Sequence, residues 1–179
     1  SAPTQVGFVA GALPADESNL VVSEIMYRPA QASAAEVAEG YSNRDLFEWI
    51  ELLNIGDAPV ALVGVSFIDG VDFNFDTGSI TSLAPGERAL VVRSLEAFTF
   101  RYGAAAAARV AGEFANETGL SNDGEQVIVQ GTGGVIRDFT YNDRAPWPEA
   151  ADGDGFSLVL IAPESNPDHA VASNWQSSA

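Results

Sequence analysis

The chain has 179 residues, and 46% of them are hydrophobic, so it can bury a core and does not have the composition of a disordered polypeptide. Its 25 acidic residues stand against 8 arginines and no lysine, and the net charge of −17 disfavours binding to nucleic-acid phosphates and anionic membrane surfaces. The absence of cysteine excludes disulfides and thiolate sites, and no apolar run approaches the ~20 residues of a membrane span.

The N-terminal region is predicted to lie outside the folded domain. Residues 1–18 are small and polar and show no clean period, so we interpret them as a tail or linker, with residues 6–9 as a candidate edge strand. Residues 19–179 show no internal repeat and are predicted to form one domain. The first strand is expected over residues 20–27 and ends before Pro29, because proline cannot donate to a strand ladder.

An alanine- and glutamate-rich segment at residues 30–44 interrupts the strand pattern. It is predicted to form one or two helical turns that end near Gly40, in a surface loop where added length costs little. The strand expected over residues 47–53 carries large apolar side chains on both of its faces. It is therefore predicted to be a central strand that is covered on both sides.

The middle of the chain alternates short strands with turn residues. Strands are expected over residues 60–68 and 71–75, and Asp69-Gly70 forms the tight turn between them. A further strand is expected over residues 89–92, after the turn Leu83-Ala84-Pro85-Gly86. This pattern favours an all-β architecture over one in which strands alternate with helices.

A short helix and a hairpin follow this strand-rich part. Ser94 is expected to cap a helix that runs to Tyr102. A hairpin with a glycine-rich turn is expected over residues 125–141, and the last strand over residues 156–161, before a polar tail from Ala162. The total of about eight to ten short strands, with turn signals roughly every ten residues, is typical of a β-sandwich or barrel.

Several of these segments also occur in the order of one known family. The motifs are Ser23-Glu24-Ile25-Met26-Tyr27-Arg28-Pro29, Glu48-Trp49-Ile50-Glu51-Leu52-Leu53-Asn54, the turn and strand of 83–92, Leu120 to Glu125, Val135-Ile136-Arg137-Asp138, Tyr141-Asn142-Asp143 with Trp147-Pro148, Gly155-Phe156-Ser157-Leu158, and Asn174-Trp175. In this order they resemble the lamin-tail domain over residues 19–175. The resemblance implies an all-β, immunoglobulin-like β-sandwich of the lamin-tail type, with one or two short helical insertions.

The resemblance also carries a functional expectation. It implies a non-catalytic interaction or structural module of a larger exported bacterial protein, located outside the cell or at the cell surface. The family offers no catalytic residues to carry over, so the chain is not expected to be an enzyme. The expected partner is a protein or a cell-surface component, and the isolated domain is expected to be a monomer.

A flexible acidic loop at residues 151–155 offers the best candidate metal ligands. Asp152 and Asp154 lie in it, and Asp143 precedes it, so the three carboxylates are a candidate Ca²⁺ site. The alternative is an ordinary glycine-rich turn without a cofactor. The acidic segment at residues 72–78 fails the EF-hand pattern, since Gly78 occupies position 7, and it is interpreted as a strand with alternating side chains.

Two glutamates lie in mostly apolar strand segments. A buried carboxylate must be paired, hydrogen-bonded, metal-bound or protonated, and Arg28 or Arg44 is the expected partner of Glu24 and Glu48. The alternative for each glutamate is an exposed position at a sheet edge.

The remaining candidates favour binding or packing over catalysis. His169 is the single histidine and lies in a polar segment without a nucleophile motif. Trp147 between two prolines is interpreted as a packing residue, and the alternative is a platform for carbohydrate binding. The alternative to a simple interaction module is a calcium-stabilised adhesion or glycan-contacting module. An enzyme with an acidic site would instead need two carboxylates about 5–10 Å apart in one cleft.

Overall fold

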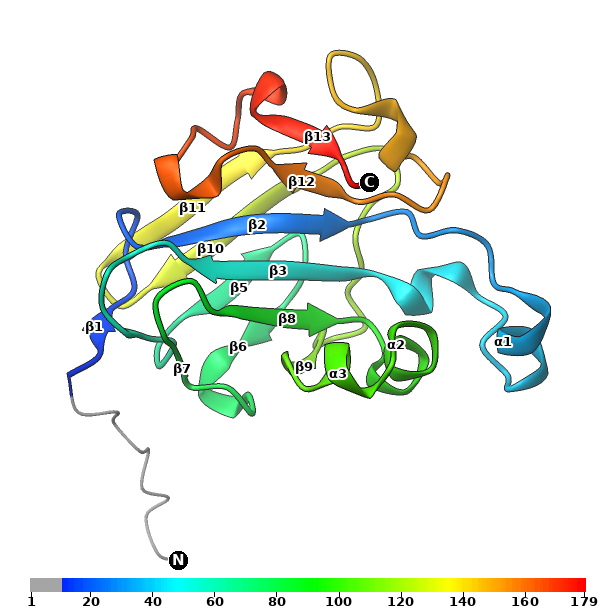
Figure 1. Cartoon of the computed structure of the whole chain (residues 1–179), viewed down its shortest axis with the longest axis horizontal. Coiled ribbons are helices and arrows are strands. Elements are labelled where there is room, and N and C mark those ends of the chain that lie inside the picture. The colour runs from blue at the N-terminus through cyan, green and yellow to red at the C-terminus, as the bar shows by residue number, and fades with distance from the viewer. Residues whose placement is uncertain (1–10) are drawn as a thin grey trace, which may run out of the picture.

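The largest element of the fold is a six-stranded sheet with the strand order β13-β12-β2-β3-β8-β9 (Figure 1). The fold is that of a computed structural model, which describes residues 11–179. The candidate strand at residues 6–9 therefore lies outside the described residues. The strands of the six-stranded sheet are β2 (Leu20–Met26), β3 (Trp49–Asn54), β8 (Arg88–Val92), β9 (Val110–Glu113), β12 (Leu158–Leu160) and β13 (Trp175–Ser177). Neighbouring strands are antiparallel except for β8 and β9, which are parallel.

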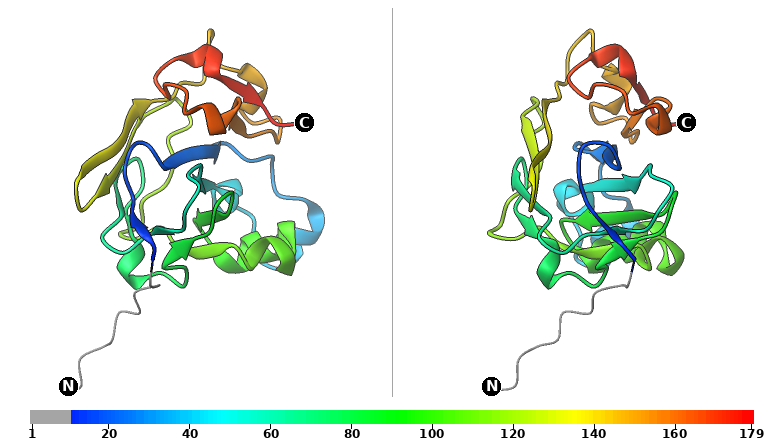
Figure 2. Two further views of the ribbon diagram at one scale, coloured as in Figure 1. Left: turned by 60° about the vertical axis from the view of Figure 1, so that its left-hand side comes forward. Right: turned by 90° about the vertical axis from the view of Figure 1, so that its left-hand side faces the viewer.

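A smaller antiparallel sheet has the strand order β11-β10-β5-β6 and faces the large one (Figure 2). Its strands are β5 (Ser66–Asp69), β6 (Phe73–Asn74), β10 (Gln126–Gly131) and β11 (Gly134–Thr140). A third sheet combines β1 (Leu13–Pro14), β4 (Val60–Ala61) and β7 (Ser82–Leu83). The strand β1 lies within the segment that we interpreted as a tail.

The prediction of one continuous strand over residues 60–68 is wrong, because this segment forms two separate strands, β4 and β5. The chain leaves the third sheet after Ala61 and enters the smaller sheet at Ser66. Between them Gly64 adopts a φ of +76°, a backbone conformation that interrupts a strand and that glycine tolerates best. The hairpin expected around Asp69-Gly70 is confirmed as the pair β5 and β6, but its connection is longer than a tight turn, since the innermost paired residues are Phe67 and Phe73. The strand expected over residues 71–75 is limited to Phe73–Asn74, because a 3₁₀ turn begins at Phe75.

The main core fills the space between the two larger sheets. Alternate side chains of each strand point into it, for example Ile50 and Leu52 from β3 and Val127 and Val129 from β10, and all four are fully buried. The immunoglobulin-like β-sandwich expected from the sequence is therefore confirmed.

Short helices cover part of the outer face of the large sheet (Figure 1). They are α2 (Leu95–Tyr102), capped by Ser94 as expected, and α3 (Ala104–Ala107), while α1 (Ala34–Ala38) lies in the predicted insertion. A second apolar cluster joins Trp49, Leu90 and Phe98 under α2, so β3 is central and covered on both faces as predicted. Single 3₁₀ turns occupy Arg44–Phe47, Phe75–Thr77, Glu149–Ala151, Pro163–Ser165 and Ala172–Asn174.

The C-terminal segment is not the polar tail expected from the sequence. It ends in the strand β13, which pairs with β12 and extends the large sheet. Trp175 is 3% exposed, and its ring stacks on that of Phe139 with 5.7 Å between centroids. A three-residue strand is too short to show an alternating pattern, so its pairing became visible only in the fold. Within residues 11–179, no helix has the length and apolar character needed to cross a membrane.

Candidate functional site

The three predicted calcium ligands have different surroundings. Asp152 forms an ion pair with Arg28, Asp143 lies 3.7 Å from Arg144, and Asp154 is exposed. Among residues 11–179, no group of three or more acidic, histidine or cysteine side chains is arranged to hold a metal ion. The calcium site therefore stays a prediction.

Two arginines hold the acidic loop against the end of β2. Arg28 bonds to Asp152, and Arg44 donates to the Arg28 carbonyl oxygen over 3.3 Å. Gly153 has a φ of +97°, and a Cβ at that position would lie 2.8 Å from the Arg44 guanidinium. The loop is therefore packed closely against these arginines.

Polar groups without hydrogen-bond partners also occur beside this loop. The Tyr27 hydroxyl, Asn122 Oδ1 and Asp143 Oδ1 are buried and unpartnered among the described residues. Burial raises the pKa of Tyr27, and the charges of Asp152 and Asp143 raise it further. The surroundings of Tyr27 are therefore rich in acceptor oxygens.

The buried carboxylate of Glu48 is held by a partner that we did not predict. Arg93 donates to Glu48 Oε2 over 3.2 Å, and the Leu120 amide donates to the same oxygen over 3.0 Å. Neither Arg28 nor Arg44 takes part, because both lie against the acidic loop. Glu48 is 1% exposed, and this burial raises its pKa to about 7 despite the opposing effects of the Leu120 amide and of Arg93.

Glu24 lies on the outer face of the large sheet, directly opposite Glu51 on β3. The Ser157 hydroxyl donates to Glu24, so the expected arginine partner is wrong here as well. Burial raises the pKa of Glu24, the Ser157 hydrogen bond lowers it, and the Glu51 carboxylate raises it again.

Glu51 is the best-bonded carboxylate of this face. It accepts hydrogen bonds from the Ser23 hydroxyl over 2.8 Å and from Arg109 over 3.5 Å, and it forms an ion pair with Arg88 at 3.1 Å. These groups are far apart in the sequence. The pairing of β2, β3 and β8 brings Ser23, Glu51 and Arg88 together.

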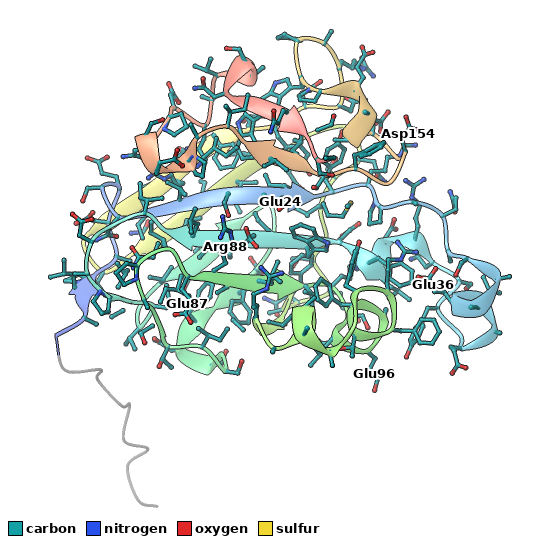
Figure 3. The ribbon with its side chains drawn as sticks, in the orientation of Figure 1. Glu24, Glu36, Glu87, Arg88, Glu96 and Asp154 are labelled. Carbon is teal, nitrogen blue, oxygen red and sulfur yellow. The ribbon has the colours of Figure 1, made fainter. Side chains whose placement is uncertain are left out.

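These side chains line a groove of about 440 Å³ on the part of the outer face that the helices leave open. We call it the sheet groove and define it by Glu24, Trp49, Glu51, Arg88, Tyr102 and Arg109. Figure 3 shows Glu24 and Arg88 together on this face of the large sheet. The Arg88 and Arg109 side chains are 42% and 50% exposed, so they can contact a ligand from solvent.

Aromatic side chains form the wall of the sheet groove on its helical side. The Tyr102 ring meets Trp49 edge-on at 6.3 Å and lies 4.7 Å from Phe98. The Trp49 indole nitrogen is buried and has no hydrogen-bond partner among the described residues. An aromatic wall beside fixed charged donors and acceptors is suited to binding a polar ligand.

Glu24 and Glu51 both line the sheet groove, and two carboxylates in one cleft are what an acidic hydrolase would need. Both are already bonded within the protein, Glu51 by two arginines and Ser23, and Glu24 by Ser157. The geometry therefore shows a preorganised polar surface rather than a free acid and base.

His169 and Trp147 serve the packing of the C-terminal segment. His169 is 4% exposed, its Nε2 lies 3.1 Å from the Val22 carbonyl oxygen, and burial lowers its pKa to about 4. Trp147 is 9% exposed and packs 6.1 Å from Trp175, as its interpretation as a packing residue predicts.

Sequence reasoning missed most of the sheet groove. Arg88, Tyr102 and Arg109 were not singled out, although Trp49 and Glu51 alternate in the strongest strand. Their shared face was a usable signal, but their partners follow only from the register of β3 with β8.

Comparisons with known proteins identify one family. The family model for the Lamin Tail Domain matches residues 14–143, which is more than half of the chain. No curated protein and no solved structure shows a significant match. The matched region ends before β12 and β13, so these two strands of the large sheet lie outside it.

Proposed function

Because the chain belongs to the lamin tail domain family, we propose that it is a non-catalytic module that binds a protein or a cell-surface component. This proposal includes the expectation of a larger exported bacterial protein as its setting. A rigid sandwich with a polar surface fits such a role, since paired strands hold the binding groups in fixed positions.

The observation that supports the proposal best is the sheet groove. Its charged groups are held in place by intramolecular bonds before any partner arrives, which lowers the entropic cost of binding. Its aromatic wall supplies apolar contact area next to them.

The proposal is tested by filling the sheet groove. Ala106 lies on α3 and lines the groove, whereas its neighbour Ala105 is exposed. The chain and its A106W and A105W variants would be immobilised and exposed to an extract of the cells that produce the protein. The same partner should be retained by the wild type and by A105W and lost from A106W.

Retention of that partner by A106W would exclude the sheet groove as the binding site. Turnover of a chromogenic glycoside by the wild type, lost in Glu24→Gln, would contradict the non-catalytic assignment. Melting temperatures of the variants show whether each of them is folded.

A second candidate function is a calcium-stabilised adhesion or glycan-contacting module. The observation that favours it is the pair of buried acceptor oxygens Asn122 Oδ1 and Asp143 Oδ1, which have no donor among the described residues. They belong to neighbouring loops, since the Asn142 amide donates to the Asp123 carbonyl oxygen over 3.4 Å. Amide and carboxylate oxygens are suitable ligands for Ca²⁺.

Thermal unfolding of EDTA-treated protein tests the calcium candidate. Millimolar Ca²⁺ at fixed ionic strength should raise the melting temperature by several degrees, and Mg²⁺ should raise it less. Asp143→Asn should abolish the rise. An unchanged melting temperature in the wild type would exclude the candidate, and the exposed substitution Glu164→Gln serves as the control.

A further inference from the structure

The strand β11 forms a free edge of the smaller sheet. It pairs with β10 on one side, and its backbone forms no hydrogen bond with any other segment of residues 11–179. With seven residues it is as long as β2, the other longest strand in the described part of the fold. An unpaired edge of this length is a template for an additional strand.

A groove of about 530 Å³ runs along this edge, and we call it the edge groove. Residues 135–138 of β11 form one wall, and residues 17–18 and 166–169 form the other. A second hollow of about 370 Å³ continues it toward the β10–β11 turn. Figure 1 shows β11 next to the segment that follows β12.

Arg137 ties the two walls of the edge groove together. Its guanidinium donates to the Leu20 carbonyl oxygen over 3.0 Å, and over 2.7 Å to both the Glu17 carbonyl oxygen and Asn166 Oδ1. The walls are therefore held in place within the chain itself. Val135, in the same strand, is 53% exposed and offers an apolar contact.

The edge groove is negatively charged. The acidic residues Asp16, Glu17, Asp138 and Asp168 line it or its continuation, and Arg137 is the single arginine among the same lining residues. His169 also lines the groove, but burial lowers its pKa to about 4, so it carries no charge at neutral pH. Hydrogen bonds from Ser18 lower the pKa of Asp16 and keep it ionised. A strand that enters this groove is favoured if it carries positive charge.

We propose that the β11 edge binds an extended, basic segment of a partner protein as an added strand. Backbone pairing with β11 supplies the binding energy that does not depend on sequence, and the four carboxylates select lysine and arginine side chains. This surface is separate from the sheet groove. Edge-to-edge pairing of two copies of the chain is disfavoured, because it brings the same four carboxylates of each copy together.

A synthetic heptapeptide, Lys-Val-Lys-Val-Lys-Val-Lys, is a suitable probe because its alternating pattern matches a strand. Fluorescence anisotropy would measure its affinity and that of a version N-methylated at alternate residues, which keeps the charge but cannot pair as a strand. The unmodified peptide should bind at least ~10-fold more tightly than the methylated one.

Two charge-matched variants test where the peptide binds. D138K/D168K reverses two exposed carboxylates of the edge groove. E39K/E96K reverses two exposed carboxylates directly after α1 and in the first turn of α2, and both helices lie away from β11 (Figures 1 and 2). The first should weaken binding at least ~10-fold and the second at most about twofold. In hydrogen exchange, the amides of β11 should gain protection when the peptide binds.

Three results would overturn the proposal. Equal affinity for the methylated peptide, or equal weakening by both variants, would show non-specific attraction to an acidic protein. A dimer in light scattering, together with β11 amides that are already protected from hydrogen exchange in the absence of peptide, would assign the edge to a second copy of the chain. Unchanged melting temperatures would confirm that both variants are folded.

Discussion

At the scale of single residues, the buried charged groups are held by partners that lie far away in the sequence. Glu48 is bound by Arg93, 45 positions away, and Glu36 is bound by Arg101, 65 positions away. The Arg101 guanidinium lowers the pKa of Glu36 to about 2, which keeps this carboxylate ionised. The charge state of each group is thus set by its burial and by the partner that the fold places beside it.

Gly119 is required by the Glu48–Arg93 pair. A Cβ at this position would overlap the Arg93 guanidinium and lie 3.0 Å from Glu48 Oε2. Gly119→Ala should therefore displace Arg93 and lower the free energy of unfolding by about 2 kcal/mol, since the buried Glu48 carboxyl then loses one of its hydrogen-bond donors. Urea unfolding measures the loss. Gly133→Ala, with nothing within 4 Å, is the control, and an equal loss in both would contradict this reasoning.

His169 makes the stability depend on pH. Its pKa is about 4 in the folded chain against an ordinary 6.5, so the unfolded chain binds more protons between these values. The stability contribution is therefore full above pH 6.5 and is lost as the pH falls to 4, by on the order of 3 kcal/mol. Relative to His169→Gln, the wild type should lose this amount in urea unfolding. Parallel pH profiles would refute it.

At the scale of elements, the C-terminal strand closes one side of the large sheet. Among the strands of residues 11–179, β13 pairs only with β12, and its Trp175 packs on Phe139 and on Trp147. The Trp175 indole also donates to the His169 carbonyl oxygen over 2.9 Å. One side chain thereby joins β13, β11 and the segment between β12 and β13.

Trp175→Ala should therefore destabilise the whole sandwich. Removing a buried tryptophan leaves a cavity between the sheets and costs about 3–5 kcal/mol in the free energy of unfolding. Gln176→Ala, at the next and exposed position of the same strand, should cost about 0.5 kcal/mol or less. Chemical denaturation compares the two, and similar midpoints would show that β13 is peripheral.

At the scale of the whole molecule, the buried carboxylates and the net charge of −17 both make the folded chain less stable as the pH rises. The pKa values of Glu24, Glu48 and Glu125 are raised, mainly by burial, and that of Glu48 reaches about 7. Such groups hold their protons in the folded chain after the unfolded chain has lost them. Their contribution to stability is present at low pH and is lost as the pH rises, for Glu48 between 4.5 and 7.

The protein should consequently be more stable at pH 5 than at pH 8, with His169 offsetting part of this trend below pH 6.5. Glu48→Gln keeps an acceptor for the Leu120 amide and removes the titration, so its stability should fall less over this range. Melting temperatures across the pH range at constant salt measure the effect. A wild type that gains stability from pH 5 to 8 would contradict it.

Much of the architecture followed from local patterns. The apolar groups on both faces of β3, the cap at Ser94 and the hairpin around Asp69-Gly70 each depend on residues that are close in the sequence, and the structure confirms all three. The order of the motifs identified the family, which the family comparison confirms.

The tertiary structure alone decided the partners of the charged groups and the surfaces. Which arginine reaches Glu48, which glutamate faces Glu24, and which strand is left at a free edge all depend on strand register and sheet order. These are contacts between residues distant in the chain, and no local pattern encodes them. The sequence by itself determined a sandwich with an acidic surface, because composition and period are local properties. The pairing of strands determined which charged groups lie together on that surface.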